Sequence, residues 1–148
     1  MLSTNQHLES PGSQSIDLDA LFRAARLATD RSYSPYSRFR VGAALLCEDG
    51  SVVTGANVEN RSFGLTICAE RSAVVAAVSS GRSRYLALAV CTPDAAYPVS
   101  PCGACRQVLG EFADPSMQVV YGHGEAIEAR TTLGDLLPFD SLHELSSR

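Results

Sequence analysis

Residues 85–92 read YLALAVCT, a continuous apolar run of strand length in the middle of the chain. A run without polar alternation is typical of a strand whose two faces are both covered by other elements. The segments on either side, 69–80 (AERSAVVAAVSS) and 102–112, are predicted to be helices, and the first ends before Gly81, a residue type common just past a helix end. Strands alternating with helices in this way predict a layered α/β domain.

The segments before this centre continue the alternation. Apolar residues at helical spacing predict a first helix from about 16–18 to 29, with Asp17 or Ser15 as its N-cap. The segment 31–39, with its proline and small polar residues, is expected to be a loop. Two extended runs follow at 41–47 and 51–58, and the Asp49-Gly50 pair between them indicates a hairpin.

The segments after the centre are shorter. Ser100 and Pro101 are expected to cap and open the helix at 102–112, because proline suits the first helical position. Short strands are predicted at 117–121 and 126–130, and Thr132 is expected to cap a short last helix that stops before Pro138. No internal repeat or interdomain linker interrupts the chain.

Length and composition indicate one globular domain. The 148 residues, 45% of them hydrophobic, suffice for one core, and we expect a flexible N-terminal extension at 1–15 and a single catalytic domain at 16–148. All twelve basic residues are arginine, so chemistry that needs a lysine (Schiff bases, P-loops) is excluded. The net charge of −4 argues against a nucleic-acid partner.

Neither a secretory signal nor a membrane span is expected. The start of the chain lacks a basic and then apolar leader, and no stretch approaches the roughly 20 apolar residues that cross a bilayer. We therefore expect a cytoplasmic protein without a membrane partner. In that reducing compartment, cysteine spacing points to metal binding or catalysis more than to disulfides.

Three of the five cysteines form a metal-binding pattern. Cys102 and Cys105 are three residues apart at the start of one predicted helix, and Cys68 stands at the start of another. Three thiolates leave the fourth position of a tetrahedral zinc ion open, which is the arrangement of a catalytic site. Helix N-termini favour thiolates, because their positive partial charge lowers a cysteine pKa. Cys47 and Cys91 lie in apolar strand patterns and are expected to fill the core.

Two residues beside Cys68 are candidates for the chemistry. Glu70 could exchange a proton with a water molecule activated by the metal, as a general acid and base. Arg71 could hydrogen-bond the sulfurs and offset the excess negative charge of three thiolates on one divalent ion. A cysteine, then x-Glu, then Pro-Cys-x-x-Cys is the pattern of zinc deaminases. Two alternatives for the cysteines are a structural zinc site and a redox-active dithiol. The alternative for Arg71 is a purely structural role. The histidines (His7, His123, His143) lie outside this pattern and are not expected to be ligands.

Over residues 18–138, the chain closely resembles the small, single-domain, homotetrameric cytidine deaminases. The resemblance is carried by the blocks 34–39 (SPYSRF) with 41–44 (VGAA), 57–60 (NVEN), 68–71 (CAER) and 101–107 (PCGACRQ). It implies a three-layer α-β-α fold, with a five-stranded mixed sheet between helices and both zinc-bearing helices on one face. It also implies one zinc ion per subunit and a homotetramer.

The resemblance further implies the reaction and its residues. An activated water would attack C4 of cytidine or 2′-deoxycytidine, while Glu70 protonates N3 and then the departing amine, in pyrimidine salvage. Asn57 and Glu59 match positions that hydrogen-bond the ribose, Phe39 an aromatic beside the base, and Ala69 a backbone N–H for the pyrimidine O2. Two alternative substrates remain for this reaction: a related nucleoside such as blasticidin S, or a nucleic acid.

Two positions depart from the family pattern. Phe63 stands where relatives often have tyrosine, so a hydroxyl contact is absent there. Relatives commonly carry Leu-Leu-Pro-x-x-Phe near the C-terminus, with a phenylalanine that stacks on the base in a neighbouring subunit. Here Ser141 occupies that place and Phe139 stands two residues earlier. Either a local rearrangement lets Phe139 stack on the base in its place, or the base is covered less well than in relatives.

Overall fold

The structure, a computed structural model, describes residues 15–142 and 145. Its centre is a five-stranded sheet in the order β2-β1-β3-β4-β5, in which β3 and β4 are parallel and all other neighbours are antiparallel. The strands are β1 (Gly42–Cys47), β2 (Val52–Ala56), β3 (Tyr85–Cys91), β4 (Ala113–Gly122) and β5 (Ala129–Thr132). The helices are α1 (Leu18–Ala28), α2 (Ala69–Ser79), α3 (Gly103–Phe112) and α4 (Leu133–Leu136), with short 3₁₀ turns η1 (Thr29–Arg31) and η2 (Phe63–Leu65).

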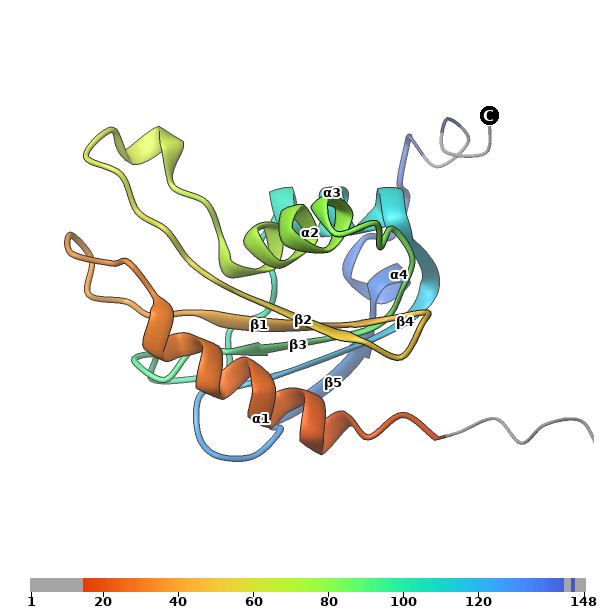
Figure 1. Ribbon diagram of the computed structural model, residues 1–148, viewed down its shortest axis with the longest axis horizontal. Coiled ribbons are helices and arrows are strands. Elements are labelled where there is room, and N and C mark those ends of the chain that lie inside the picture. The colour runs from red at the N-terminus through yellow and green to blue at the C-terminus, as the bar shows by residue number, and fades with distance from the viewer. Residues whose placement is uncertain (1–14, 143–144, 146–148) are drawn as a thin grey trace, which may run out of the picture.

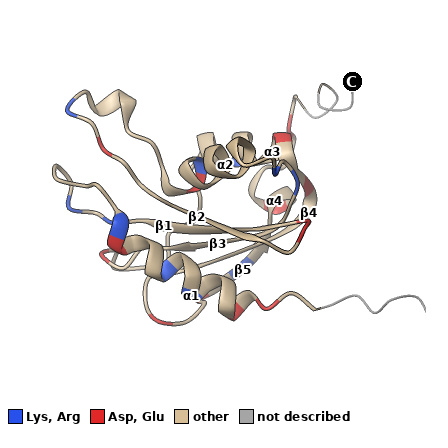
Figure 2. Ribbon diagram, in the orientation of Figure 1, with Lys and Arg blue, Asp and Glu red and all other residues tan. Residues whose placement is uncertain are grey.

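The helices cover both faces of the sheet. Helix α1 lies along one face, and α2, α3 and α4 lie on the other (Figure 1). The central strands β1 and β3 carry no charged residue, as Figure 2 shows, because both of their faces are buried. In β1, Ala43 and Leu45 pack towards α2, while Ala44 packs towards α1. The predicted three-layer fold with its five-stranded mixed sheet is thus confirmed.

Backbone close approach places α2 on the sheet. A Cβ atom at Gly55 would lie 2.4 Å from the backbone nitrogen of Ala73 and 2.5 Å from the carbonyl oxygen of Ala69. No side chain fits at that distance, so glycine lets β2 contact the first turns of α2 directly. This contact fixes the N-terminal end of α2, where Cys68, Ala69 and Glu70 lie.

Most predicted elements occur within two residues of their expected ends. Asp17 is the N-cap of α1 and accepts a hydrogen bond from the backbone N–H of Ala20. Gly50 in the hairpin turn and Gly81 after α2 both have positive φ, as turns of these kinds require. The Thr132 hydroxyl accepts from the backbone N–H of Asp135 at the start of α4, as predicted.

Three boundaries differ from the predictions. Helix α3 begins at Gly103 with Cys102 as N-cap, because Ser100 and Pro101 instead accept hydrogen bonds from the Arg106 side chain. Strand β4 begins at Ala113, earlier than expected, with a register irregularity opposite β3. The start of β5 moves from 126 to Ala129, because the Glu128 carboxylate binds the backbone N–H groups of the preceding turn.

No helix in the described residues is long and apolar enough to cross a membrane. The predicted flexible extension at 1–15 lies outside the described residues except for Ser15, so its flexibility stays a prediction. His7 and His143 also lie outside them.

Candidate metal centre and active site

The three predicted metal ligands come together where two helices begin. Cys68 is the N-cap of α2, Cys102 is the N-cap of α3, and Cys105 lies one turn further along α3. Their sulfur atoms all lie within 4.8 Å of one another, with 3.8 Å between Cys68 and Cys102 and 3.4 Å between Cys102 and Cys105. Residues 34 positions apart in the chain thus form one cluster.

These distances fit a zinc ion. Tetrahedral coordination with Zn–S bonds of about 2.3 Å places neighbouring sulfurs roughly 3.8 Å apart, whereas a disulfide requires about 2.05 Å. In the described part of the chain no fourth His, Cys, Asp or Glu joins the cluster. Cys47 and Cys91 are buried in the core, as predicted, and not in the cluster. The cluster can therefore supply three sulfur ligands to one ion.

Hydrogen bonds favour the ionised form of Cys68. Those that it receives from Cys105 and Arg71 lower its pKa to about 5. The Arg71 Nη2 atom lies 3.4 Å from the Cys68 sulfur. When no metal ion is bound, the hydrogen bond that the Cys105 thiol donates to Cys68, together with burial, raises the pKa of Cys105. Arg71 therefore contacts the Cys68 sulfur, and its effect on the charge of the cluster stays a prediction.

Glu70 is buried beside the cluster. Its side chain belongs to the first turn of α2, and only 4% of the residue is exposed. Burial, reinforced by the nearby Cys68 charge, raises the pKa of Glu70 to about 7. A carboxyl group that titrates near neutral pH can both accept and donate a proton there.

A cavity of about 390 Å³ joins this cluster to the loop that precedes β1. Residues from five segments line it: Ser37, Phe39, Val41, Asn57, Glu59, Cys68, Glu70, Val90, Thr92, Val99, Ser100 and Cys102. Six of the nine predicted site residues therefore line one space: Phe39, Asn57, Glu59, Cys68, Glu70 and Cys102. A volume of this size suits a small-molecule ligand.

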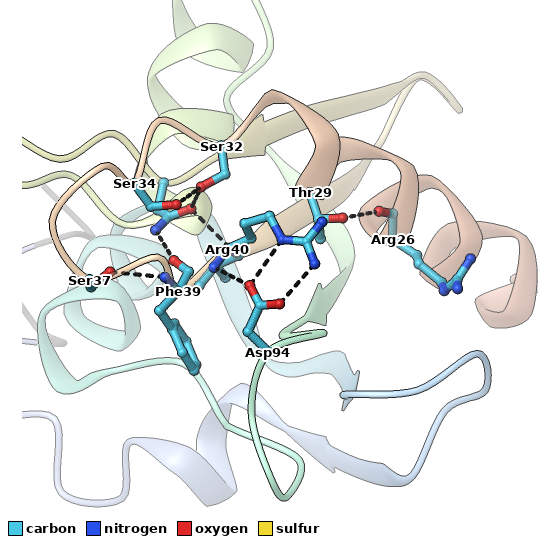
Figure 3. Close-up of polar contacts among 10 residues, drawn as sticks. Arg26, Thr29, Ser32, Ser34, Ser37, Phe39, Arg40 and Asp94 are labelled. Atoms are coloured by element: carbon cyan, nitrogen blue, oxygen red, sulfur yellow. Dashed lines mark hydrogen bonds and ion pairs between the residues drawn. The ribbon is translucent and has the colours of Figure 1, made fainter.

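Asn57 and Glu59 line the cavity and hold the loop before β1. The Asn57 side chain accepts from the Ser32 hydroxyl and the Val41 backbone N–H, and donates to the Phe39 carbonyl oxygen. Figure 3 shows Ser32, Ser34, Ser37 and Phe39 in this network. Both residues follow the end of β2, but the backbone at Val58 stays extended and bridges two neighbouring segments, so the two side chains share a face.

The Glu59 carboxylate binds the same loop. It accepts from the backbone N–H groups of Tyr36 and Ser37 and from the Ser37 hydroxyl. The Ser37 contact, more than the backbone bonds, lowers the pKa of Glu59, so the group is an anion at neutral pH. Asn57 and Glu59 thereby shape the loop that carries Phe39, which lines the cavity.

The remaining predicted positions lie as follows. Ala69 is fully buried as the first residue of α2 and does not line the cavity with its side chain. Phe63 is 73% exposed and makes an edge contact with Tyr36. Phe139 has a positive φ and is 99% exposed, so its ring contacts no part of its own cavity.

Two contacts were not predicted from the sequence. The Arg106 guanidinium donates to the Pro101 carbonyl, the Ser100 hydroxyl and the Leu136 carbonyl, which fixes the turn before Cys102 to the end of α4. Arg40 pairs with Asp94, 54 residues away. No local spacing signals contacts of this range. His123 pairs with Glu128 and does not belong to the cysteine cluster.

Comparisons with known proteins agree with this geometry. The family model "Cytidine and deoxycytidylate deaminase zinc-binding region" matches residues 15–122. A protein of Halalkalibacterium halodurans named "Cytidine deaminase" is 48% identical over 123 residues, 83% of this chain and 92% of that protein. A Mycobacterium tuberculosis protein of the same name is 47% identical and covers 83% of this chain and 88% of its own length.

A solved structure is similarly close. The crystal structure of cytidine deaminase from Burkholderia pseudomallei has a TM-score of 0.78 and 43% identity, covering 84% of this chain and 98% of that one. A Bacillus cereus protein named "Blasticidin-S deaminase" is more distant, at 28% identity over 109 residues. The predicted zinc cofactor is confirmed by the family model and the cysteine cluster together. The chain belongs to the cytidine and deoxycytidylate deaminase family.

Proposed function

We propose that this protein is a zinc-dependent hydrolase that deaminates cytidine and 2′-deoxycytidine to uridine and 2′-deoxyuridine, with release of ammonia. One observation carries the proposal. A single cavity is lined by Cys68, Glu70 and Cys102 and also by Asn57 and Glu59. Such a cavity would bring the group that transfers protons and the groups that bind the ribose to one nucleoside.

Cys68, Cys102 and Cys105 would hold the zinc ion. When bound, zinc acts as a Lewis acid that makes water nucleophilic at neutral pH. The thiolates partly neutralise this effect, since three negative charges exceed the charge of the ion. Arg71 withdraws part of the Cys68 charge through its hydrogen bond and thereby restores electrophilicity.

Glu70 would move the protons. As a carboxylate it accepts the proton of the attacking water, and as an acid it donates to N3 of the cytosine ring. The same group would then accept the second proton, from the hydroxyl added to C4, and donate it to the departing amine, so that ammonia leaves as the C4 carbonyl forms. Burial raises the pKa of Glu70 towards neutral pH when no metal ion is bound, which brings its acid and carboxylate forms closer in free energy.

The substrate would lie between Phe39 and the metal cluster. Asn57 and Glu59 would hydrogen-bond the ribose, chiefly its 3′-hydroxyl, with the base beside Phe39. The Ala69 backbone N–H, free at the first position of α2, would bind the pyrimidine O2. The support for these roles is the position of each residue around the cavity or at its helix end.

The test is ultraviolet monitoring of cytidine loss by the wild type and by Glu70→Gln, with zinc content measured for both. We expect kcat to fall by about 10²- to 10⁴-fold, because the proton shuttle is lost while every sulfur ligand remains. Equal zinc content in both proteins shows that the site is intact. Equal activity in the two proteins would reject the role of Glu70, and no cytidine loss in either protein would reject the proposal in favour of a structural zinc site.

A substrate panel distinguishes the proposed substrates from the alternatives. Cytidine and 2′-deoxycytidine are expected to react, whereas blasticidin S and single-stranded DNA or RNA are expected to remain unchanged. Salt-insensitive turnover of the mononucleosides would further separate the enzyme from nucleic-acid editing. Turnover of blasticidin S alone would contradict the proposal.

Assembly and location complete the proposal: a homotetramer that works in cytoplasmic pyrimidine salvage. Large apolar side chains are exposed around η2 and the loop before β1, and such patches commonly mark interfaces. They are Tyr33, Tyr36, Val58, Phe63, Leu65 and Ile67. Phe139, exposed on its own chain, would then be available to the site of a neighbour.

A further inference from the structure

The segment between β3 and α3 forms one wall of the cavity. Thr92, Val99 and Ser100 line the cavity from this segment. Its two ends are anchored, at Thr92 by a backbone bond to Gly122 and at Ser100 by the Arg106 side chain. Between these anchors, the polar contacts of residues 93–99 in the described chain are a local Ala95-to-Thr92 bond and the contacts of Asp94 with Arg40.

The Arg40–Asp94 contact consists of three hydrogen bonds. The Arg40 backbone N–H and Nε donate to Asp94 Oδ2, each at 2.9 Å, and Nη2 donates to Oδ1 at 2.8 Å. Figure 3 shows the guanidinium aligned with both carboxylate oxygens. This two-pronged geometry sets direction as well as distance, which a single-point ion pair does not.

Arg40 itself belongs to another wall of the cavity. Its neighbours Phe39 and Val41 both line the cavity, and the Asn57 side chain holds both of their backbones. The wall at 39–41 is therefore fixed to the sheet, while residues 93–99 depend on Arg40 for their polar attachment to it.

The catalytic groups do not depend on this contact. Cys68 and Glu70 are positioned by α2, and Cys102 and Cys105 by α3 with the help of Arg106. Loss of the Arg40–Asp94 contact would widen or loosen the cavity wall without moving the sulfurs or the proton shuttle. An effect on substrate binding that leaves the chemical step intact is the kinetic signature of such a role.

We propose that Arg40 and Asp94 are a positioning pair that fixes the 93–99 wall against the Phe39 wall and thereby sets the affinity for the nucleoside. The inference rests on the proposed function for its kinetic readout. Neither residue touches the substrate in this proposal. Both act through the residues on either side of them that line the cavity.

The test compares steady-state kinetics on cytidine for Arg40→Ala, Asp94→Ala and the double variant. We expect Arg40→Ala to raise KM roughly two- to fivefold, the range of an exposed ion pair. Asp94→Ala also removes the acceptor for the Arg40 backbone N–H, so its KM should rise roughly three- to tenfold. The double variant should match Asp94→Ala, and kcat should stay within about twofold throughout.

Two further readouts separate positioning from a general loss of stability. Hydrogen exchange of the backbone at 93–99 should become faster in both single variants, while exchange in α2 and α3 stays unchanged. Raising the ionic strength should move the wild-type KM towards that of Arg40→Ala, because salt screens a half-exposed pair and cytidine is uncharged at neutral pH.

Arg82→Ala is the matched control. Arg82 and Asp49 form an ion pair of 2.9 Å and similar exposure at the opposite end of the sheet, away from the cavity. Its loss should leave KM unchanged. An active wild type whose KM and exchange rates do not change in Arg40→Ala and Asp94→Ala would overturn the inference alone. A wild type without activity on cytidine would contradict the proposed function. Even in that case, unchanged backbone hydrogen exchange at 93–99 in the two single variants would refute the positioning role of Arg40 and Asp94.

Discussion

The five cysteines divide into two groups by the surroundings of their sulfur atoms. Cys68, Cys102 and Cys105 meet at two helix N-termini, where partial positive charge and N–H groups stabilise thiolates. Cys47 and Cys91 are enclosed by apolar neighbours, and burial raises the pKa of Cys91. Identical side chains are thus candidate metal ligands in one setting and small apolar residues in the other.

This division leads to a direct comparison of zinc content. Cys105→Ala removes one of three ligands, so we expect zinc binding to weaken more than a hundredfold, since even changes outside the ligand set commonly cost about 10- to 100-fold. Cys91→Ala, the matched buried cysteine, should keep its full zinc content. Metal analysis after dialysis against a weak chelator measures both. Full zinc in Cys105→Ala would remove this residue from the ligand set.

Arg71 allows a second test at the scale of one residue. Arg71→Gln removes the cationic donor to Cys68, so the thiolate charge reduces the electrophilicity of the site, and kcat should fall roughly tenfold. Zinc should stay bound, because every sulfur remains. The control is Arg23→Gln, an exposed arginine on α1 across the sheet. Equal kinetics in Arg71→Gln and the wild type would assign Arg71 a structural role.

At the scale of elements, glycine sets the distance between β2 and α2. Gly55→Ala places a methyl group against the backbone of Ala69 and Ala73 and should lower the free energy of unfolding by about 2 kcal/mol or more. Gly64→Ala is the control, since no atom lies within 4 Å of a Cβ at that position. Urea unfolding measures both. A stable Gly55→Ala variant would show that α2 can move away from the sheet freely.

The Arg40–Asp94 contact also predicts a pH dependence of stability. Hydrogen bonds from Arg40 hold the pKa of Asp94 below its ordinary value, so the folded state binds fewer protons than the unfolded state. The stabilisation is complete above about pH 5 and disappears as the pH falls through the lowered pKa, below about 4. The stability difference between the wild type and Asp94→Asn should therefore be full at pH 7 and smaller at pH 3. Urea titrations at both values test the sign.

The sequence predicted the elements well where local patterns determine them. The apolar run at 85–92, the hairpin glycine Gly50 and the Thr132 cap are read from neighbouring residues, and each appears in the structure. The start of α3 could not be predicted in this way. Its Ser100-Pro101 signal is overridden by Arg106, whose side chain reaches back to both residues.

The candidate site shows the same limit. Cys68, Glu70, Cys102 and Cys105 could be identified because helix periodicity places them at helix starts with a known chemistry. The Arg40–Asp94 pair could not, because it joins loops 54 residues apart that only the folded sheet brings together. The structural bonds of Asn57 and Glu59 to the loop before β1 were likewise invisible in the sequence.

At the scale of the whole molecule, we expect the 15.7 kDa chain to assemble into a homotetramer. Light scattering after size exclusion should give a mass of about four chains. If Phe139 covers the base in a neighbouring subunit, Phe139→Ala should raise KM for cytidine. If Phe139 does not cover it, KM should stay unchanged. A monomer with full activity would contradict the need for assembly.

The cavity walls also separate two tasks along the chain. The groups around the proposed ribose end come from residues 37–59, while the metal ligands and the proton shuttle come from residues 68–105. Natural variation in the first stretch can therefore alter which nucleoside is accepted while the reaction itself is inherited intact. A chimaera that takes its first 60 residues from a relative of different preference should acquire that preference together with the loop.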